Sequence, residues 1–147
     1  MSDIDNIDFI LTGESFAGIK LNDPLEKVFA LLGDEEEKVG VERYGFLHFE
    51  QGIRIGYLDN TVDELSILFT PKAKFSYLVR NSLNEEIAIN GKTQLHEFIY
   101  LLKTKRIKWR CIDDKNMSDL MLEMNGQVLA CFDLYTGYLN KIFIGRK

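Results

Sequence analysis

Few residues of this chain stand in a pattern that supports catalysis or metal binding. The two histidines, His48 and His96, have no partner histidine or cysteine at the spacing of a zinc site. The sequence contains no G-x-S-x-G nucleophile elbow, no glycine-rich phosphate loop and no calcium-binding loop. The acidic pairs Asp63–Glu64 and Asp113–Asp114 are typical of turns and solvated strand edges. We therefore expect no catalytic residue, no metal, no cofactor and no enzymatic activity.

The two cysteines also favour a structural reading. Cys111 and Cys131 lie in strand-like segments beside other apolar residues, without nearby cysteine or histidine partners. We expect both to be small buried side chains in a reducing compartment.

The most informative charges form an acidic run, Asp34 to Glu37, whereas the corresponding segment of the second half carries Lys103, Lys105, Arg106 and Lys108. One interpretation is drift on a solvated surface. The functional alternative is an acidic patch that docks a basic protein and raises the rate and specificity of association. Tyrosines near predicted turns would supply aromatic anchors, or they are ordinary strand-end residues. The predicted partner-binding residues are Asp34, Glu35, Glu36, Glu37, Tyr57, Asp59, Tyr135 and Tyr138.

The element that must position these charges is an amphipathic helix predicted over Asp23 to Leu32. Asp23 is a candidate cap, Pro24 suits the first helical position, Gly33 ends the helix, and Leu25, Val28, Phe29 and Leu32 form an apolar stripe. The pattern recurs 70 positions later (95 minus 25), where Thr93 takes the place of Asp23. The matching apolar residues are Leu95, Phe98, Ile99, Leu101 and Leu102. Because the offset is constant, we interpret the repeat as a tandem duplication.

Each repeat is predicted to open with a short helix, Ile4 to Leu11 in the first copy and around Phe75 to Val79 in the second. Extended pieces follow at Phe16 to Leu21 and at Ile87 to Ile89, and each leads into its main helix. In the first copy we expect strands at Lys38 to Arg43, Phe46 to Glu50, Ile53 to Leu58 and Val62 to Phe69, with a tight turn at Gln51–Gly52. In the second copy they are Ile107 to Ile112, Leu120 to Met124, Gln127 to Leu134 and Tyr138 to Ile144.

Alternation of apolar and polar residues assigns these strands to two faces. Val39 and Val41, like Ile107, Trp109 and Cys111, are predicted to point toward the core. The free face would carry His48, Glu50, Arg54, Ser66, Glu123, Asp133 and Lys141.

The predicted fold is therefore α+β. A tandem duplication of a helix-helix-four-strand unit forms a curved antiparallel sheet of about eight strands, with helices on one face. The 147 residues suit a single domain made of two repeats, about 1–70 and 71–147.

The bulk properties restrict the partner. A net charge of −5 makes a nucleic-acid partner unfavourable and is compatible with a basic protein. We expect a cytoplasmic protein with no membrane association, because the acidic start is not a signal peptide and no run approaches about 18 apolar residues.

Two family resemblances follow from these patterns. From Gly18-Ile19-Lys20-Leu21 to Leu31-Leu32-Gly33 the sequence resembles bacterial outer-membrane assembly lipoproteins and the β-lactamase inhibitor proteins. The latter are duplicated, each copy having helices followed by a four-stranded sheet, so the resemblance implies that layout alone, since those families are exported. In class, size and charge the chain also resembles immunity proteins that neutralise bacterial nuclease toxins, including those of contact-dependent inhibition.

These observations lead to two functional hypotheses. The first is a protein inhibitor, specifically an immunity protein that binds a basic, nuclease-like toxin and blocks its active surface. The alternative is a ligand- or single-stranded nucleic-acid-binding module that uses the free sheet face, with the basic segment Lys103 to Arg110 and Trp109 available for stacking. A core position for Trp109 would argue against this alternative.

Overall fold

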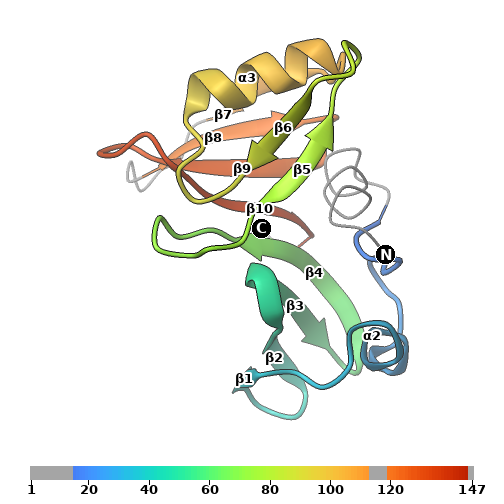
Figure 1. The fold of residues 1–147 in the computed structure, drawn as a ribbon. Coiled ribbons are helices and arrows are strands. Elements are labelled where there is room, and N and C mark those ends of the chain that lie inside the picture. Colours follow the sequence, from blue (N-terminus) through green and yellow to red (C-terminus); the bar gives the residue numbers. More distant parts are fainter. Residues whose placement is uncertain (1–14, 113–118, 146–147) are drawn as a thin grey trace.

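The structure is a computed structural model, and it describes residues 15–112 and 119–145. It is an α+β fold in which an eight-stranded antiparallel sheet packs against helices α2 (Leu25–Leu32) and α3 (Leu95–Thr104) (Figure 1). The strands of the first half are β1 (Glu37–Gly40), β2 (Tyr44–His48), β3 (Ile53–Leu58) and β4 (Thr61–Leu68). Those of the second half are β7 (Trp109–Ile112), β8 (Asp119–Met124), β9 (Val128–Asp133) and β10 (Leu139–Gly145). None of the helices in the described residues is long and apolar enough to cross a membrane.

The two halves meet at the centre of the sheet, whose strand order is β1-β2-β3-β4-β10-β9-β8-β7. From either edge of the sheet toward the central β4–β10 pair, the four strands of each half follow one another in chain order. In that pair Ser66 lies opposite Phe143, with Leu65 opposite Ile144 and Ile67 opposite Ile142. A local two-fold axis between Ser66 and Phe143 would therefore relate residues 77 positions apart (143 minus 66), which matches the offset between the last strands of the two halves.

The turns that precede the two helices are also built alike. The Lys20 amide donates to the Asp23 carboxylate at 2.8 Å, and the Asn90 amide donates to the Thr93 hydroxyl at 2.9 Å. The carbonyls of Asp23 and Thr93 in turn accept hydrogen bonds from the amides of Val62 in β4 and Leu139 in β10. Each helix thus begins from the same place relative to the last strand of its half.

The helices differ from the prediction in how they begin and in what they bury. The cap residues are Pro24 and Gln94 rather than Asp23 and Thr93, whose side chains hold the preceding turns instead. In α2 only Val28 is buried, and Phe29 is 37% exposed, so the predicted core position of Phe29 is wrong. In α3 the stripe is buried at Phe98, Leu101 and Leu102.

A second sheet stands where the sequence predicted a helix at Phe75 to Val79. Strands β5 (Tyr77–Arg80) and β6 (Glu86–Ile89) form an antiparallel hairpin. The helix prediction is wrong because Tyr77 and Val79 alternate onto one buried side, and Tyr77 contacts the rings of Phe69 and Phe75 at centroid distances of 6.2 and 5.8 Å. The predicted helix at 4–11 lies outside the described residues.

Several shorter predictions also need correction. Gln51–Gly52 belongs to a 3-10 helix, η1 (Glu50–Gly52), so Glu50 is not a strand residue. The predicted extended piece at Phe16 to Leu21 is instead a tight turn, in which Phe16 and Ile19 bridge each other across Ala17 and Gly18.

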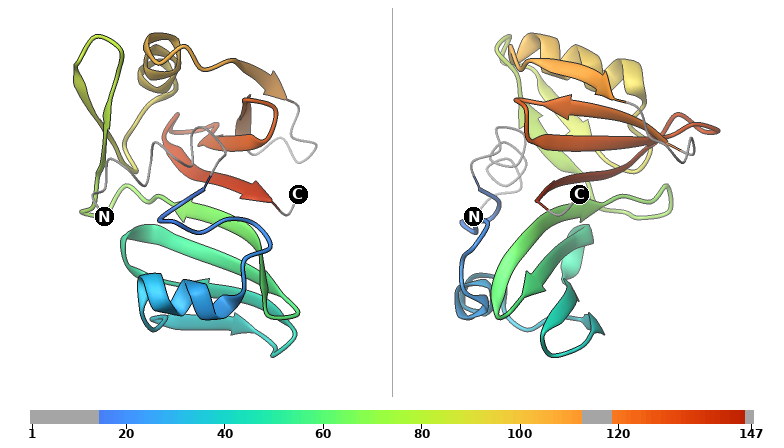
Figure 2. Two further views of the ribbon diagram at one scale, coloured as in Figure 1. Left: turned by 90° about the vertical axis from the view of Figure 1, so that its right-hand side faces the viewer. Right: turned by 180° about the vertical axis from the view of Figure 1, so that it is seen from behind.

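The main core lies on the face of the sheet covered by α3 and the β5–β6 hairpin, which occupy the same side of β7–β10 (Figure 2). The register places Lys38 opposite the buried Leu47 and Val39 opposite Phe46, so Val39 points away from this core and is 47% exposed. The predicted inward position of Val39 is therefore wrong by one residue, and Val41 is exposed as well. Cys111 is exposed because β7 is an edge strand, whereas Cys131 is buried as predicted.

Candidate protein-binding site

The acidic run connects α2 to the edge strand β1. Asp34, Glu36 and Glu37 are exposed, Glu35 is half-buried, and the Glu36 amide donates to the His48 carbonyl at 2.8 Å. Within residues 15–112 and 119–145, no ion pair involves any of these four carboxylates. The run therefore presents four negative charges to solvent beside an ordered strand.

Strand β1 adds an open edge and apolar side chains to these charges. In the described part of the chain it pairs only with β2, so its outer N–H and C=O groups face away from the sheet. Val39, Val41 and Tyr44, at the β1–β2 hairpin, are 47%, 53% and 54% exposed. Charge, apolar surface and free backbone groups are thus combined in one place, and we call Asp34 to Val41 together with Tyr44 the acidic edge.

Tyr57 lies beneath the surface next to the acidic edge and is not a surface anchor. Its side chain is only 1% exposed, its hydroxyl donates to the Val41 carbonyl, and Lys38 Nζ lies 5.6 Å from its ring centroid. Tyr57 therefore does not have the exposed position that the sequence analysis expected of an aromatic anchor, because its buried ring holds the β1–β2 turn.

Asp59 lies close to the acidic edge but is paired. It occupies the β3–β4 turn, and its Oδ1 accepts a hydrogen bond from Arg43 Nε at 2.9 Å, in a pair that is largely exposed. Because Arg43 directly precedes Tyr44, the structure places Asp59 beside the exposed aromatic residue of the edge.

The other two predicted tyrosines belong to the opposite half of the molecule. Tyr135 is 96% exposed in the β9–β10 turn, and Tyr138 is half-buried in the same turn. The Asp133 carboxylate accepts the backbone amides of Thr136 and Tyr135, and these bonds lower the pKa of Asp133. The β9–β10 turn and the segment before β1 lie far apart in every view, so the structure does not bring these tyrosines to the acidic edge (Figures 1 and 2).

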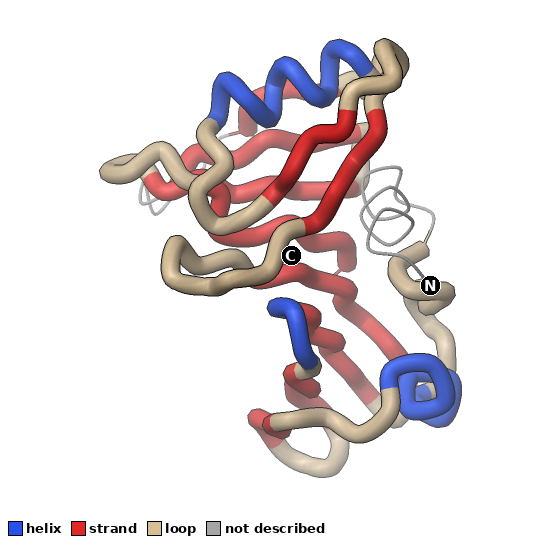
Figure 3. Tube along the Cα trace, viewed as in Figure 1, coloured by secondary structure: helices blue, strands red, loops and turns tan. Residues whose placement is uncertain are grey.

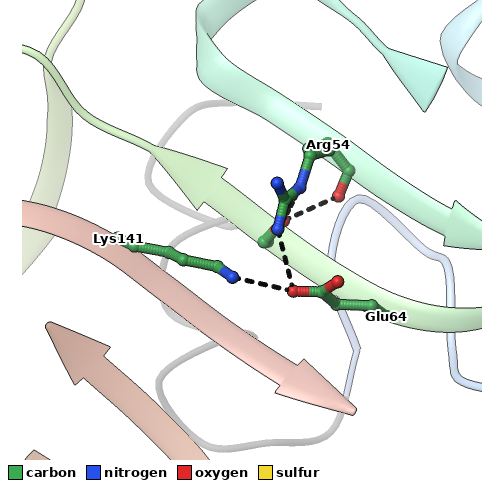
Figure 4. A network of polar contacts seen from close by, with 4 residues as sticks. Arg54, Glu64 and Lys141 are labelled. Atoms are coloured by element: carbon green, nitrogen blue, oxygen red, sulfur yellow. Dashed lines mark hydrogen bonds and ion pairs between the residues drawn. The ribbon is translucent and has the colours of Figure 1, made fainter. Parts of the chain in front are cut away.

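The face of the sheet opposite the core carries a buried ionic network at the junction of the halves. Glu64 Oε1 lies 3.2 Å from an Arg54 guanidinium nitrogen and 3.1 Å from Lys141 Nζ, with the Glu64 side chain only 3% exposed (Figure 4). Arg54 also donates to Ser66 Oγ at 3.3 Å. The register puts Arg54, Ser66 and Lys141 on the predicted free face, as the sequence indicated.

Aromatic rings flank the two cations of this network. The Arg54 guanidinium lies 4.2 Å from the ring centroid of Phe46, and Lys141 Nζ lies 4.0 Å from that of Phe143. Phe143 packs in turn with Leu129 and Cys131 in a second, smaller apolar cluster. The charged groups of this network are thus paired with one another, which makes them a structural link between the halves.

A shallow hollow of about 400 Å³ opens at the start of β7. It is lined by Lys108, Trp109, Arg110, Glu123, Asn125 and Gly126. Trp109 is half-buried and packs against the main core, and Arg110 is held by Glu123 at 2.9 Å. The basic segment is therefore beside a hollow, but its aromatic residue is largely used for packing.

No group of three or more histidine, cysteine, aspartate or glutamate side chains in the described residues is placed to hold a metal ion. His48 is half-buried in β2, whereas His96 is exposed on the first turn of α3.

The comparisons with known proteins bear on the fold. No protein-family model matches the chain, and no curated protein matches its sequence. The structure is similar to the crystal structure of a DUF4309 family protein, YjgB, from Bacillus subtilis subsp. subtilis str. 168. The TM-score is 0.57 and the sequence identity 16%, with 99% of this chain and 98% of that chain covered. This likeness shows a shared fold and gives no information about activity.

The sequence analysis missed the exposed valines of the acidic edge. Alternation assigned Val39 and Val41 to the core, although the position of β1 at the sheet edge leaves both at the surface. The available signal was the acidic run itself, because a strand that directly follows four carboxylates is typical of a solvated edge.

Proposed function

We propose that the protein binds another protein through its acidic edge and inhibits it. The observation that carries the proposal is the junction of Asp34 to Glu37 with the open strand β1 and the exposed Val39, Val41 and Tyr44. Complementary charge accelerates encounter, and apolar and aromatic groups supply the contacts that slow dissociation. An open strand edge also offers main-chain hydrogen bonds to an extended segment of the partner.

The partner class that suits this surface is a basic protein, and we propose a nuclease-like toxin, which would make this chain its immunity protein. The small size and acidic charge of the chain support this assignment, since such an inhibitor needs a preformed face and no catalytic group. In this role the protein would act in the cytoplasm, where a toxin of this kind meets its substrate, and would itself catalyse no reaction.

The test is capture of the partner followed by inhibition. Tagged wild-type protein and the variant D34N/E35Q/E36Q/E37Q would be used to capture proteins from the source cells, and the captured protein would then be purified and assayed. We expect wild type to retain a basic protein and to abolish its toxicity or nuclease activity at a molar ratio of inhibitor to captured protein of about 1:1. The variant should need a higher concentration for the same inhibition.

A matched control separates this site from the general effect of net charge. E26Q/E50Q/E85Q/E86Q removes four exposed carboxylates from other parts of the surface and changes the net charge equally. If this control inhibits as poorly as the edge variant, then the acidic edge is not the docking site. If wild type leaves every captured protein fully active, the inhibitor proposal fails.

We also propose that the two halves arose by tandem duplication within one domain. The support is the shared geometry of the turns at Lys20–Asp23 and Asn90–Thr93 and the palindromic strand order. The helix that was predicted to open the second repeat is a hairpin, so the repeated unit is a turn, one helix and four strands.

The hollow beside Trp109 favours a second candidate, the binding of single-stranded nucleic acid. Lys108 and Arg110 flank the indole at that site, although by register the ring lies on the core side of β7 rather than on the free face. Trp109 is the only tryptophan of the chain, so quenching of its fluorescence by an oligonucleotide tests the idea directly. Quenching that is not reduced in K108Q/R110Q would contradict it.

A further inference from the structure

Two loops of the second half enclose a hollow that the proposed function does not use. One loop, residues 70–76, connects β4 to β5, and the other, residues 90–92, connects β6 to α3; they lie side by side (Figure 3). The hollow between them measures about 270 Å³. It is lined by Pro71, Lys72, Ala73, Lys74, Phe75, Ser76, Asn90, Gly91 and Lys92.

The backbones of the two loops lie in close contact. A Cβ atom on Gly91 would lie 1.9 Å from the Thr70 carbonyl oxygen and 2.8 Å from the Pro71 nitrogen, so only glycine permits this approach. Asn90 Nδ2 donates to Ser76 Oγ at 3.1 Å, and this hydrogen bond joins the two loops. The hollow is thus a built part of the fold, whose two walls are held in position.

The charges around the hollow all have one sign. Lys72, Lys74 and Lys92 line it from both loops, and no acidic residue is among the described residues that line it. All three lysines are exposed, and no salt bridge of the described residues includes them. In a chain with a net charge of −5, three ammonium groups on one small hollow are a local excess of positive charge.

We propose that this lysine hollow, defined by Lys72, Lys74 and Lys92, binds a small phosphorylated molecule. Lysine ammonium groups bind phosphate as point charges, and three of them match the charge of a phosphate monoester or a diphosphate. The size of the hollow fits such a ligand. A nucleic-acid backbone is disfavoured, because its affinity depends on many phosphate contacts and the protein as a whole is acidic.

The inference is independent of the acidic edge. The lysine hollow shares no residue with Asp34 to Val41 or Tyr44, and its loops flank the β5–β6 hairpin rather than β1. Loss of phosphate binding would therefore leave the inhibitor proposal standing, and failure of the inhibitor proposal would leave this one standing.

The experiment is a titration of the full chain with pyrophosphate and with inorganic phosphate, followed by calorimetry and by amide shifts in NMR spectra. We expect saturable binding of pyrophosphate, with shifts concentrated in residues 70–76 and 90–92. In K72Q/K74Q/K92Q the affinity should fall about tenfold or more, since each lost charge-assisted contact weakens binding.

The control is K20Q/R43Q/R80Q, which removes the same charge from exposed basic residues elsewhere and should change the affinity by less than about twofold. Equal losses in both variants would overturn the proposal, because they would show a response to net charge only. The absence of saturable binding by wild type at about 10 mM pyrophosphate would also overturn it. A thermal melt of each variant in the absence of ligand confirms that the chain is folded.

Discussion

The two helices begin from equivalent turns, yet they are buried to different extents. Leu101 of α3 is 0% exposed and Ile99 is half-buried, whereas Leu31 and Phe29, their counterparts in α2, are 48% and 37% exposed. The spacing of apolar residues is the same in both helices. The two helices differ in the elements that cover their apolar stripes. The periodicity of a stripe therefore predicts a helix but does not determine how deeply the helix is buried.

The covering element of α3 is the β5–β6 hairpin. The Ser82 hydroxyl donates to the Thr104 carbonyl at the end of α3, the Tyr100 hydroxyl donates to Glu85 at 2.7 Å, and Lys105 Nζ donates to the Arg80 carbonyl at 3.2 Å. The bond to Glu85 raises the pKa of Tyr100. Residues 15–24, which precede α2, form the short Phe16–Ile19 bridge and the Pro24–Thr61 bridge to β4, and they include no hairpin. The second half is therefore the more tightly packed, and the first half leaves more apolar surface exposed near the acidic edge.

Truncation of one phenylalanine in each helix should give the largest contrast. F98A removes a ring that is 1% exposed and packs edge-on against Phe132 at a centroid distance of 5.5 Å, so we expect a loss of about 3–5 kcal/mol in the free energy of unfolding. F29A removes a partly exposed ring and should cost about 1 kcal/mol or less. Urea denaturation of both variants measures the difference. Equal losses would show that α2 is as deeply packed as α3.

The next effect concerns the ionic link between the halves. E64A would leave Arg54 and Lys141 without their shared carboxylate at a nearly buried site, and we expect it to cost about 3 kcal/mol. The comparison is E123A, which removes the ion-pair partner of Arg110. The Arg110 side chain is 72% exposed, so E123A should cost about 1 kcal/mol or less. Chemical denaturation would give both values, and a loss in E64A no greater than that in E123A would exclude a structural role for the network.

A smaller effect follows from the different chemistry of the equivalent turns. The backbone amide of Lys20, together with Lys27, lowers the pKa of Asp23 below its ordinary value. A carboxylate with a lowered pKa stabilises the folded state at pH values above its unfolded pKa of about 3.9, and this stabilisation is lost as the pH falls through the folded pKa. Thr93 makes the corresponding bond with a hydroxyl that does not titrate in this range.

Replacing Asp23 by the residue of the other half is therefore a direct test. D23T should remove part of the acid-induced loss of stability while costing about 1 kcal/mol or less at neutral pH, because the threonine hydroxyl can accept the same amide hydrogen bond. T93S serves as the control and should leave the pH dependence unchanged. Stability measured between pH 2 and 7 decides the matter, and identical pH profiles for D23T and wild type would rule out a contribution from Asp23.

These comparisons also show which parts of the molecule the sequence could predict. The apolar stripe after Thr93 predicted α3, and alternation placed Arg54, Ser66 and Lys141 on one face, because each signal is local. The exposure of Val39 and the burial of Tyr57 depend on which strand forms the edge, and the hairpin in place of a helix at Tyr77 depends on packing against Phe69. Those features arise from contacts between distant segments, which one sequence does not reveal.

The smallest effect on stability is expected at the acidic edge, where the two halves differ in the sign of their charge. D34N/E35Q/E36Q/E37Q should leave the free energy of unfolding within about 0.5 kcal/mol of wild type, because these side chains lie at the surface and form no ion pair with described residues. Binding to a basic partner should nevertheless slow down. The change should appear in the association rate and should shrink as salt is raised, since surface charges steer encounter and are screened beyond about 8–10 Å near physiological ionic strength. Stopped-flow measurements at two salt concentrations compare wild type with the acidic variant and with K103Q/K108Q. The lysine variant removes positive charge from the basic segment after α3, so it shows whether the sign of the charge matters. The lysine variant should associate at least as fast as wild type, whereas equal association rates for wild type and the acidic variant at low salt would eliminate the acidic edge as the docking site and direct attention to the exposed β9–β10 turn.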